Sequence, residues 1–334
     1  VRTWTYLSHR SGWLENARRW QNETRALEDA LSDKLHEKLK QRFIDRRTSV
    51  LLKKLKDDVP LLAGVTEDGE VIVEGEFVGR LLGFQFILDP RAKGPHAKAV
   101  RFAALKALKP ELATRAAALA AAGFHEFKLR EDGTIWWRQS AVARLTKGPQ
   151  PLRPEFKLVA MEHLPPQSLP SIEDRIREFI ADRVENLIGP LVSLQKAVNE
   201  VSDSPEALEA SARGVAYRLI ENFGAISRNQ IADEVKALEQ PERGKLRKLG
   251  IRFGEYTIHM PNLLKPAPAH FLALLWALWE SKAPDSFEVP PAGSTSVPNN
   301  KDLPAAFYFA SGYRPSGARA VRIDMLERLA GEVR

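Results

Sequence analysis

Two groups of basic residues carry the clearest chemistry in this sequence, because closely spaced cations can neutralise the phosphates of a nucleic acid. The first group comprises Arg42, Arg46, Arg47, Lys53, Lys54 and Lys56. These cations recur on successive turns of a predicted helix, where they could contact a passing strand. Asp45, Asp57 and Asp58 dilute the positive charge, so a solvated helix face remains the alternative.

The second basic group is more compact and leads into a predicted strand with aromatic residues. Its cations are Arg243, Lys245, Arg247, Lys248 and Arg252. Phe253 and Tyr256 follow, and cations beside aromatic rings suit single-stranded nucleic acid. The order of predicted helices and strand also resembles a winged helix, whose basic segment approaches a phosphate backbone. In the alternative interpretation both aromatic residues are core and the cations only increase solubility.

Patterns typical of enzyme sites are missing from the sequence. It contains no G-x-x-x-x-G-K-[ST] loop, no G-x-G-x-x-G fingerprint and no G-x-S-x-G elbow. Its seven histidines lack metal-ligand spacing, and it has no cysteine. We therefore predict no catalytic residue, no metal and no cofactor in this chain, and an independent enzyme is the least favoured class.

Composition indicates a folded, water-soluble chain with a preference for polyanions. Fifty Lys and Arg residues against forty-three Asp and Glu residues give a net charge of +7. Residues 1–58 alone hold fourteen of these cations against nine acidic residues. The longest apolar run, Phe271 to Trp279, is less than half of the ~20 residues that a membrane span needs. We expect no membrane partner and a cytoplasmic location, which the lack of cysteine also suits.

A sequence repeat with an offset of 64 residues predicts two similar β modules between residues 59 and 164. Glu67-Asp68-Gly69 corresponds to Glu131-Asp132-Gly133, and Arg80-Leu81 corresponds to Arg144-Leu145. In each copy Asp-Gly suits the turn of a β-hairpin. We predict a duplicated β-β-β-α unit joined by an alanine-rich helix. Trp136-Trp137 places one indole on each face of a strand, so one of them is expected in the core.

The remaining sequence predicts an α+β fold in which helices predominate. Residues 1–58 form a basic helical segment of one or two helices, and the proline-rich run 164–170 ends the β modules. A helical domain, winged-helix-like in part, follows at 171–282, with a helix at 172–188 interrupted at Gly189-Pro190. A further helix would be capped by Ser204. A loop and a small α/β element complete the chain at 283–334.

Parts of the sequence resemble a known family. The run WTYLSHRSGWLENARRWQNETRALEDALSDKLHEKLKQRFIDRRTSVLLKKL, from Trp4 to Leu55, resembles the segment after the second motor domain in alpha-proteobacterial DExH-box helicases of the mitochondrial degradosome Suv-three type. The later runs EVKALEQPERGKLRKLGIRFGEYTIHMPNLLKPAP and RAVRIDMLERLA are similar to the C-terminal extension of the same proteins. The resemblance implies a parent enzyme that hydrolyses ATP and unwinds RNA.

Two functions therefore compete. In the first, the chain is an accessory region that guides RNA or another single strand, and ATP and Mg²⁺ are bound only by motor domains outside it. In the second, it is a scaffold that docks a nuclease, a ribosomal component or the motor. The chain begins with Val1, and we expect it to be part of a longer protein.

Overall fold

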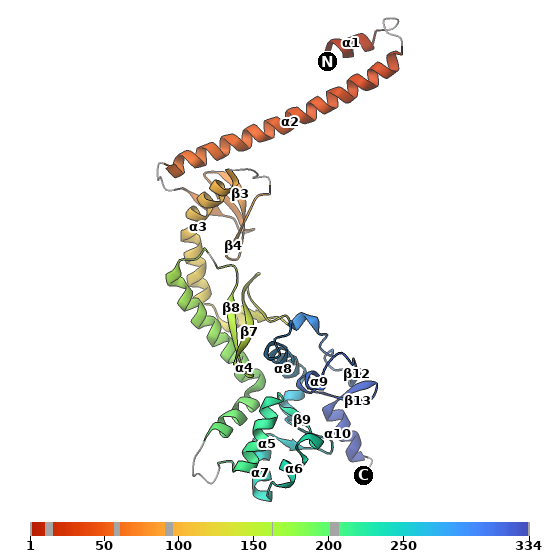
Figure 1. Ribbon diagram of the computed structural model, residues 1–334. Helices are drawn as coiled ribbons and strands as arrows, with labels where there is room; N and C mark the ends of the chain where they lie inside the picture. The colour runs from red at the N-terminus through yellow and green to blue at the C-terminus, as the bar shows by residue number, and fades with distance from the viewer. Residues whose placement is uncertain are drawn as a thin grey trace. The chain divides into compact units, whose positions relative to one another are not determined.

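The computed structural model describes residues 2–10, 16–56, 61–90, 96–161, 163–200 and 207–332. Within them, the side chains of 2, 4, 8, 17, 40–56 and 96 are not described. The described chain forms ten α-helices and four small antiparallel sheets, so the prediction of mixed structure dominated by helices is confirmed (Figure 1).

The chain divides into two compact units, Val1–Thr114 and Arg115–Arg334. This division falls within one helix, α3 (His96–Ala120), whereas the sequence suggests boundaries at turns and linkers. The proline-rich run before residue 170 is a single 3-10 turn (Pro166–Ser168) followed at once by a helix.

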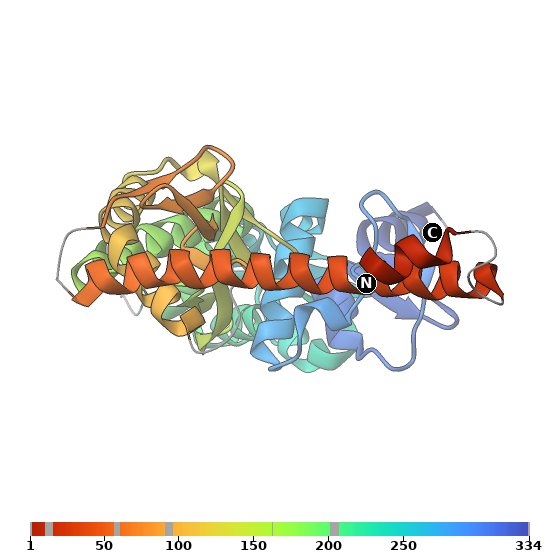
Figure 2. The same ribbon diagram turned by 90° about the horizontal axis from the view of Figure 1, so that it is seen from above.

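Unit 1 begins with α1 (Arg2–Ser8) and α2 (Ala17–Lys56), which pack against each other. The Thr5 hydroxyl donates a hydrogen bond of 2.7 Å to the Glu28 carboxylate between these two helices. The sequence leaves open whether this segment is one long helix or two. From Ala17 onward it is a single helix of 40 residues (Figure 2).

The rest of unit 1 is a four-stranded antiparallel meander followed by α3. Its strands are β1 (Ala63–Val65), β2 (Glu70–Val73), β3 (Glu76–Leu82) and β4 (Gln85–Leu88). They pair in chain order. Val71 and Val73 alternate with polar or half-buried neighbours and are fully buried, because a strand turns every second side chain to the same face.

Unit 2 opens with a sheet of the same order as the first. Its strands are β5 (Phe127–Leu129), β6 (Thr134–Trp137), β7 (Ser140–Gln150) and β8 (Arg153–Leu158). Each sheet therefore has four strands, not the three predicted. The extra strand of each meander, β1 or β5, is only three residues long, which explains why alternation does not indicate it.

The two sheets also share their strand register at the 64-residue offset. Val71 lies opposite Gly79 in the first sheet, as Ile135 lies opposite Ala143 in the second. In each sheet the next pairing skips one residue, Val78 in β3 and Val142 in β7, which forms a bulge. Both predicted turns hold glycine at positive φ, +78° at Gly69 and at Gly133, where residues with a Cβ are disfavoured. The two sheets thus share strand register and turn geometry at the offset of the sequence repeat.

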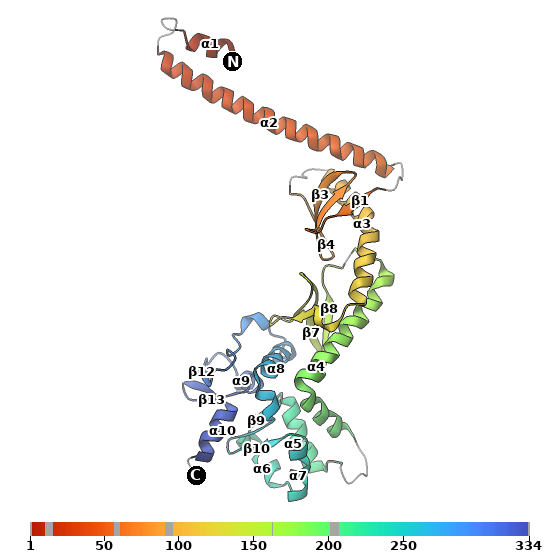
Figure 3. The same cartoon turned by 180° about the vertical axis from the view of Figure 1, so that it is seen from behind.

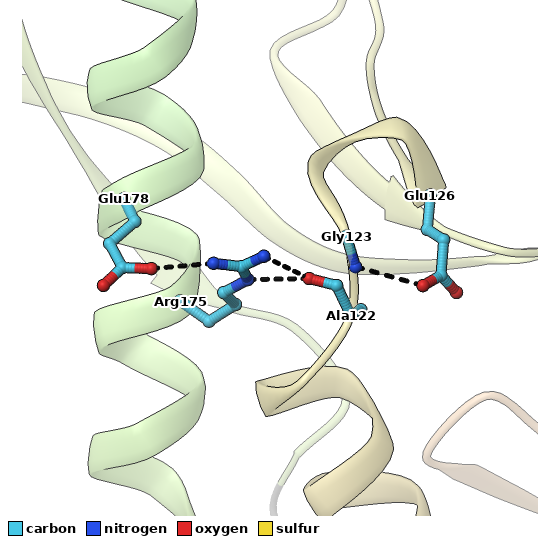
Figure 4. A network of polar contacts seen from close by, with 5 residues as sticks. All are labelled: Ala122, Gly123, Glu126, Arg175 and Glu178. Atoms are coloured by element: carbon cyan, nitrogen blue, oxygen red, sulfur yellow. Dashed lines mark hydrogen bonds and ion pairs between the residues drawn. The ribbon is translucent and has the colours of Figure 1, made fainter.

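Helix α4 (Leu169–Asn199) lies against the second sheet and against the end of α3 (Figure 4). The Arg175 guanidinium donates to the Ala122 carbonyl and forms an ion pair of 2.8 Å with Glu178. The predicted interruption at Gly189-Pro190 is present as a kink at the preceding residue, Ile188, where the backbone leaves helical geometry (φ −126°, ψ 24°). Proline cannot donate to the helix ladder, but the buried Leu191 and Leu194 keep the next turns packed.

A compact helical part with a small sheet follows (Figure 3). Its elements are α5 (Ala210–Glu221), β9 (Ala225–Ser227), α6 (Ala232–Lys236), α7 (Gln240–Lys248), β10 (Arg252–Phe253) and β11 (Thr257–His259). The strands pair in the order β10-β11-β9. The helix predicted after Ser204 begins in the described chain at Ala210, and Ser204 itself lies outside the described residues.

The last part of unit 2 contains the most apolar helix, α8 (Pro266–Trp279), as predicted. Beyond it come β12 (Ser296–Pro298), α9 (Ala305–Ala310), β13 (Tyr313–Ser316), β14 (Arg319–Arg322) and α10 (Ile323–Glu332). The rings of Trp276, Phe287 and Phe307 pack together with centroids 5.3–5.8 Å apart. Among the described helices, none has the length and apolar character to cross a bilayer.

Candidate nucleic-acid interface

The first predicted basic group lies near the end of α2. The backbone of this stretch is helical, as predicted, but its side chains lie outside those that the structure describes. The placement of the predicted contacts Arg42, Arg46, Arg47, Lys53 and Lys54 therefore stays a prediction. They belong to unit 1, whereas the second group belongs to unit 2.

Two cations of the second group, Arg243 and Lys245, have internal partners. Arg243 donates to the carbonyl oxygens of Val235 (2.8 Å) and Leu238 (3.2 Å), which ties α7 to the end of α6. Lys245 forms an ion pair of 2.7 Å with the buried Glu242 and donates to the Ala207 carbonyl. Both cations hold the fold together, so we leave them out of the interface. The spacing of Glu242 and Lys245, three residues apart on one helix, could have signalled this pair.

The end of α7 presents the next two cations to solvent. Arg247 and Lys248 are exposed, while Leu246 between the two halves of the group is fully buried and anchors the helix. Gly250 has φ +90°, and the Ile251 amide donates to the Leu246 carbonyl, so the helix ends in a Schellman-type cap. The cap directs the chain immediately into β10.

Strand β10 adds a cation, and the turn that follows it adds an aromatic ring. Arg252 is exposed, and the Tyr256 side chain is 42% exposed at the turn. The Arg314 guanidinium, from β13, lies 5.0 Å from the centre of the Tyr256 ring. Arg314 is absent from the predicted site, because it is 58 residues away in the sequence and adjoins this turn only through the fold.

This turn is braced from two sides. The Glu327 carboxylate, on α10, accepts hydrogen bonds from the amides of Glu255 (2.6 Å), Tyr256 (3.1 Å) and Thr257 (2.8 Å). The Arg228 guanidinium donates to the Gly254 carbonyl at 2.9 Å. A Cβ at Gly254 would lie 2.4 Å from the Glu327 carboxyl carbon, so glycine permits this close approach. The turn therefore offers Tyr256 from a fixed backbone.

Behind the turn, β11 carries a buried imidazole. His259 is 1% exposed, and its Nδ1 lies 3.1 Å from the Thr257 hydroxyl, which in turn donates to Glu327. Burial lowers the pKa of His259 below its ordinary value, although the nearby Glu327 carboxylate acts in the opposite direction. The imidazole is thus neutral at pH 7 and serves the packing of the sheet.

The structure also locates the two tryptophans of the predicted strand. Trp137 is 3% exposed, so one indole of the pair is core, as predicted. Trp136 is half-buried, and the Arg130 guanidinium lies 3.6 Å from its ring centre. Within the described residues, no three His, Asp or Glu side chains are grouped as metal ligands.

Comparisons of the chain with protein-family models, with curated proteins and with solved structures found no match.

Proposed function

We propose that this chain is the nucleic-acid-binding accessory region of an ATP-dependent RNA helicase, in which it guides a single strand through phosphate contacts. The contact surface in unit 2 comprises the end of α7 and the β10–β11 turn, and we call it the α7–turn surface. Its residues are Arg247, Lys248, Arg252, Tyr256 and Arg314.

One observation carries this proposal. Arg247, Lys248 and Arg252 are exposed and form no ion pair with the described residues, although many other surface cations of unit 2 are paired with carboxylates. Because these cations are neither buried nor paired with a carboxylate, they can neutralise phosphates, and binding then releases the counterions of the nucleic acid. Tyr256 beside them offers a ring for base stacking, which is tolerant of sequence.

The arrangement of elements around this surface supports the proposal. Three helices and a three-stranded antiparallel sheet follow each other as α5-β9-α6-α7-β10-β11, with β11 central. This is the order of a winged helix, where the third helix and the turn between the last two strands approach nucleic acid. By that analogy α7 is the contacting helix and the Tyr256 turn is the wing.

The identity of the bound nucleic acid rests on the family resemblance of the sequence. By that resemblance the single strand is RNA, and ATP and Mg²⁺ are bound by the motor domains of the parent protein. The basic end of α2 would add further phosphate contacts. The two equivalent sheets, each followed by a helix, are in this proposal copies of one duplicated module.

Fluorescence anisotropy with a labelled single-stranded RNA at about 50 mM salt tests the α7–turn surface. We expect the triple variant R247Q/K248Q/R252Q to bind at least about tenfold more weakly than the native chain. The slope of log affinity against log salt should also become shallower by about 0.7 for each phosphate that the variant no longer neutralises.

The matched control replaces three exposed lysines elsewhere in unit 2, K236Q/K265Q/K301Q, with the same change in net charge. It should bind nearly as the native chain does. Equal weakening by the two triple variants would mean that binding follows only net charge, and the α7–turn surface would then be abandoned.

A second candidate function, a protein-docking scaffold, is favoured by a separate observation on α2. Leu27, Leu31, Leu35 and Leu39 are 44–60% exposed and lie four residues apart along one ridge of the helix. Because such a row is costly in water, a partner surface is expected there. The motor domains are our preferred partner, with a nuclease or a ribosomal component as alternatives.

The double variant Leu31→Asp/Leu35→Asp tests the scaffold. It should abolish salt-resistant capture of separately purified motor domains, while leaving RNA binding by the α7–turn surface unchanged. Undiminished capture would exclude the leucine row as the docking site.

A further inference from the structure

A cavity in unit 2 has the dimensions and lining of a small-molecule site. It has a volume of about 490 Å³ and lies between β5, α4, α8 and the segment after α8. Its walls are largely apolar and include Phe127, Leu129, Phe271, Leu274, Phe287 and Phe307. Cavities of about 300–1,000 Å³ with apolar walls and a few polar groups are typical of ligand sites.

Arg183 of α4 is a half-buried polar residue of the wall. Its Nε is buried and has no hydrogen-bond partner among the described residues. The guanidinium instead lies 5.2 Å from the centre of the Phe179 ring. By contrast Arg175, two turns earlier on α4, has a carboxylate and a carbonyl as partners. Arg183 is half-buried and forms no ion pair with the described residues, so a ligand with an anionic group would give its guanidinium a partner.

The other charges around the cavity also favour a single anion. Lys128 and Arg130 line it and are exposed, and Glu131 is the only acidic residue in its described lining. Glu131 lies 3.8 Å from His270 Nδ1, while His270 Nε2 faces the Pro290 carbonyl at 3.1 Å. Together with Arg183, three cations against one carboxylate leave the cavity positive.

We propose that this cavity binds a small organic carboxylate with an aromatic or branched apolar body. The carboxylate would pair with the terminal nitrogens of Arg183 through charge-assisted hydrogen bonds. The apolar body would fill the space between the phenylalanine rings. This site does not involve the α7–turn surface and is independent of the proposed RNA binding.

Calorimetric titration of the full chain with 4-phenylbutyrate, and with its neutral amide as the matched ligand, tests this proposal. We expect saturable binding of the acid, and binding of the amide at least about tenfold weaker, since a hydrogen-bonded charge is missing from the amide. R183M should bind acid and amide equally. Without ligand it should unfold at about the temperature of the native chain, because Arg183 forms no ion pair with the described residues that the substitution would remove.

Two further variants keep the result interpretable if R183M folds poorly. A267W adds bulk at an exposed position of the lining and should block both ligands. R177M, which removes an exposed arginine of α4 that is ion-paired with Asp174, should bind as the native chain does.

The proposal is overturned if a panel of aromatic and branched aliphatic acids shows no saturable binding, or if R183M still prefers acid over amide. Binding of a peptide with a free C-terminal phenylalanine, with none of the small acids bound, would also overturn it, because the occupant would then be a polypeptide end.

Discussion

At the residue scale, the buried His259 predicts how stability depends on pH. Because burial lowers its pKa below 6.5, the unfolded chain binds up to one proton more than the folded chain between the folded pKa and 6.5. The free energy of unfolding of the native chain should therefore fall as the pH drops through this window, by at most about 1.4 kcal/mol per unit from this group.

Chemical unfolding measures the free energy of unfolding of the native chain and of His259→Asn between about pH 7.5 and 5.5. The asparagine keeps a polar atom near the Thr257 hydroxyl but does not titrate. Other groups titrate in both proteins, so the difference between the two curves isolates His259. Parallel curves for the two proteins would show that the imidazole titrates alike in the folded and unfolded states.

At the element scale, α10 should determine the order of the β10–β11 turn. Glu327→Ala leaves three turn amides and the Thr257 hydroxyl without their acceptor, which we expect to cost about 1–3 kcal/mol of unfolding free energy. Hydrogen exchange at residues 255–257 should accelerate, and RNA affinity should fall although no cation has been removed.

The control for this variant is Glu332→Ala, near the end of the same helix. Glu332 is exposed and lies 3.8 Å from Arg328, so its removal should change stability by less than about 0.5 kcal/mol. If both variants behave alike, the carboxylate of Glu327 does not brace the turn.

The turns of the molecule illustrate what could be predicted from the sequence. Asp-Gly at 68–69 and 132–133 indicates two hairpin turns, because the need for positive φ is local. Exposure of Arg247, Lys248 and Arg252 also agrees with their basic context. The internal roles of Arg243 and Lys245 depend on carbonyls that the fold brings near. The contacts of Arg314 and Glu327 join residues 58 to 72 positions apart, and no local pattern encodes such contacts.

At the scale of the whole molecule, the two compact units should unfold separately. Leu81 belongs to the core of unit 1 and Leu219 to that of unit 2, and both are at most 2% exposed. Each Leu→Ala substitution should cost about 2–5 kcal/mol in its own unit. Differential scanning calorimetry should show two transitions, of which L81A lowers one and L219A lowers the other. A shift of both transitions by either variant would indicate a single cooperative unit.

Each of the two sheets has a bulge at the equivalent position. This bulge determines which side chains of the strand face the core. A bulge holds one additional residue in one strand, and a slip of one position exchanges the two faces of a strand. Deletion of Val78 or Val142, the additional residue of each bulge, would leave the composition of the strand almost unchanged, yet it would exchange the two faces of the strand on one side of the bulge. Mutational scanning should therefore find these two short segments far less tolerant of one-residue deletions than of conservative replacements.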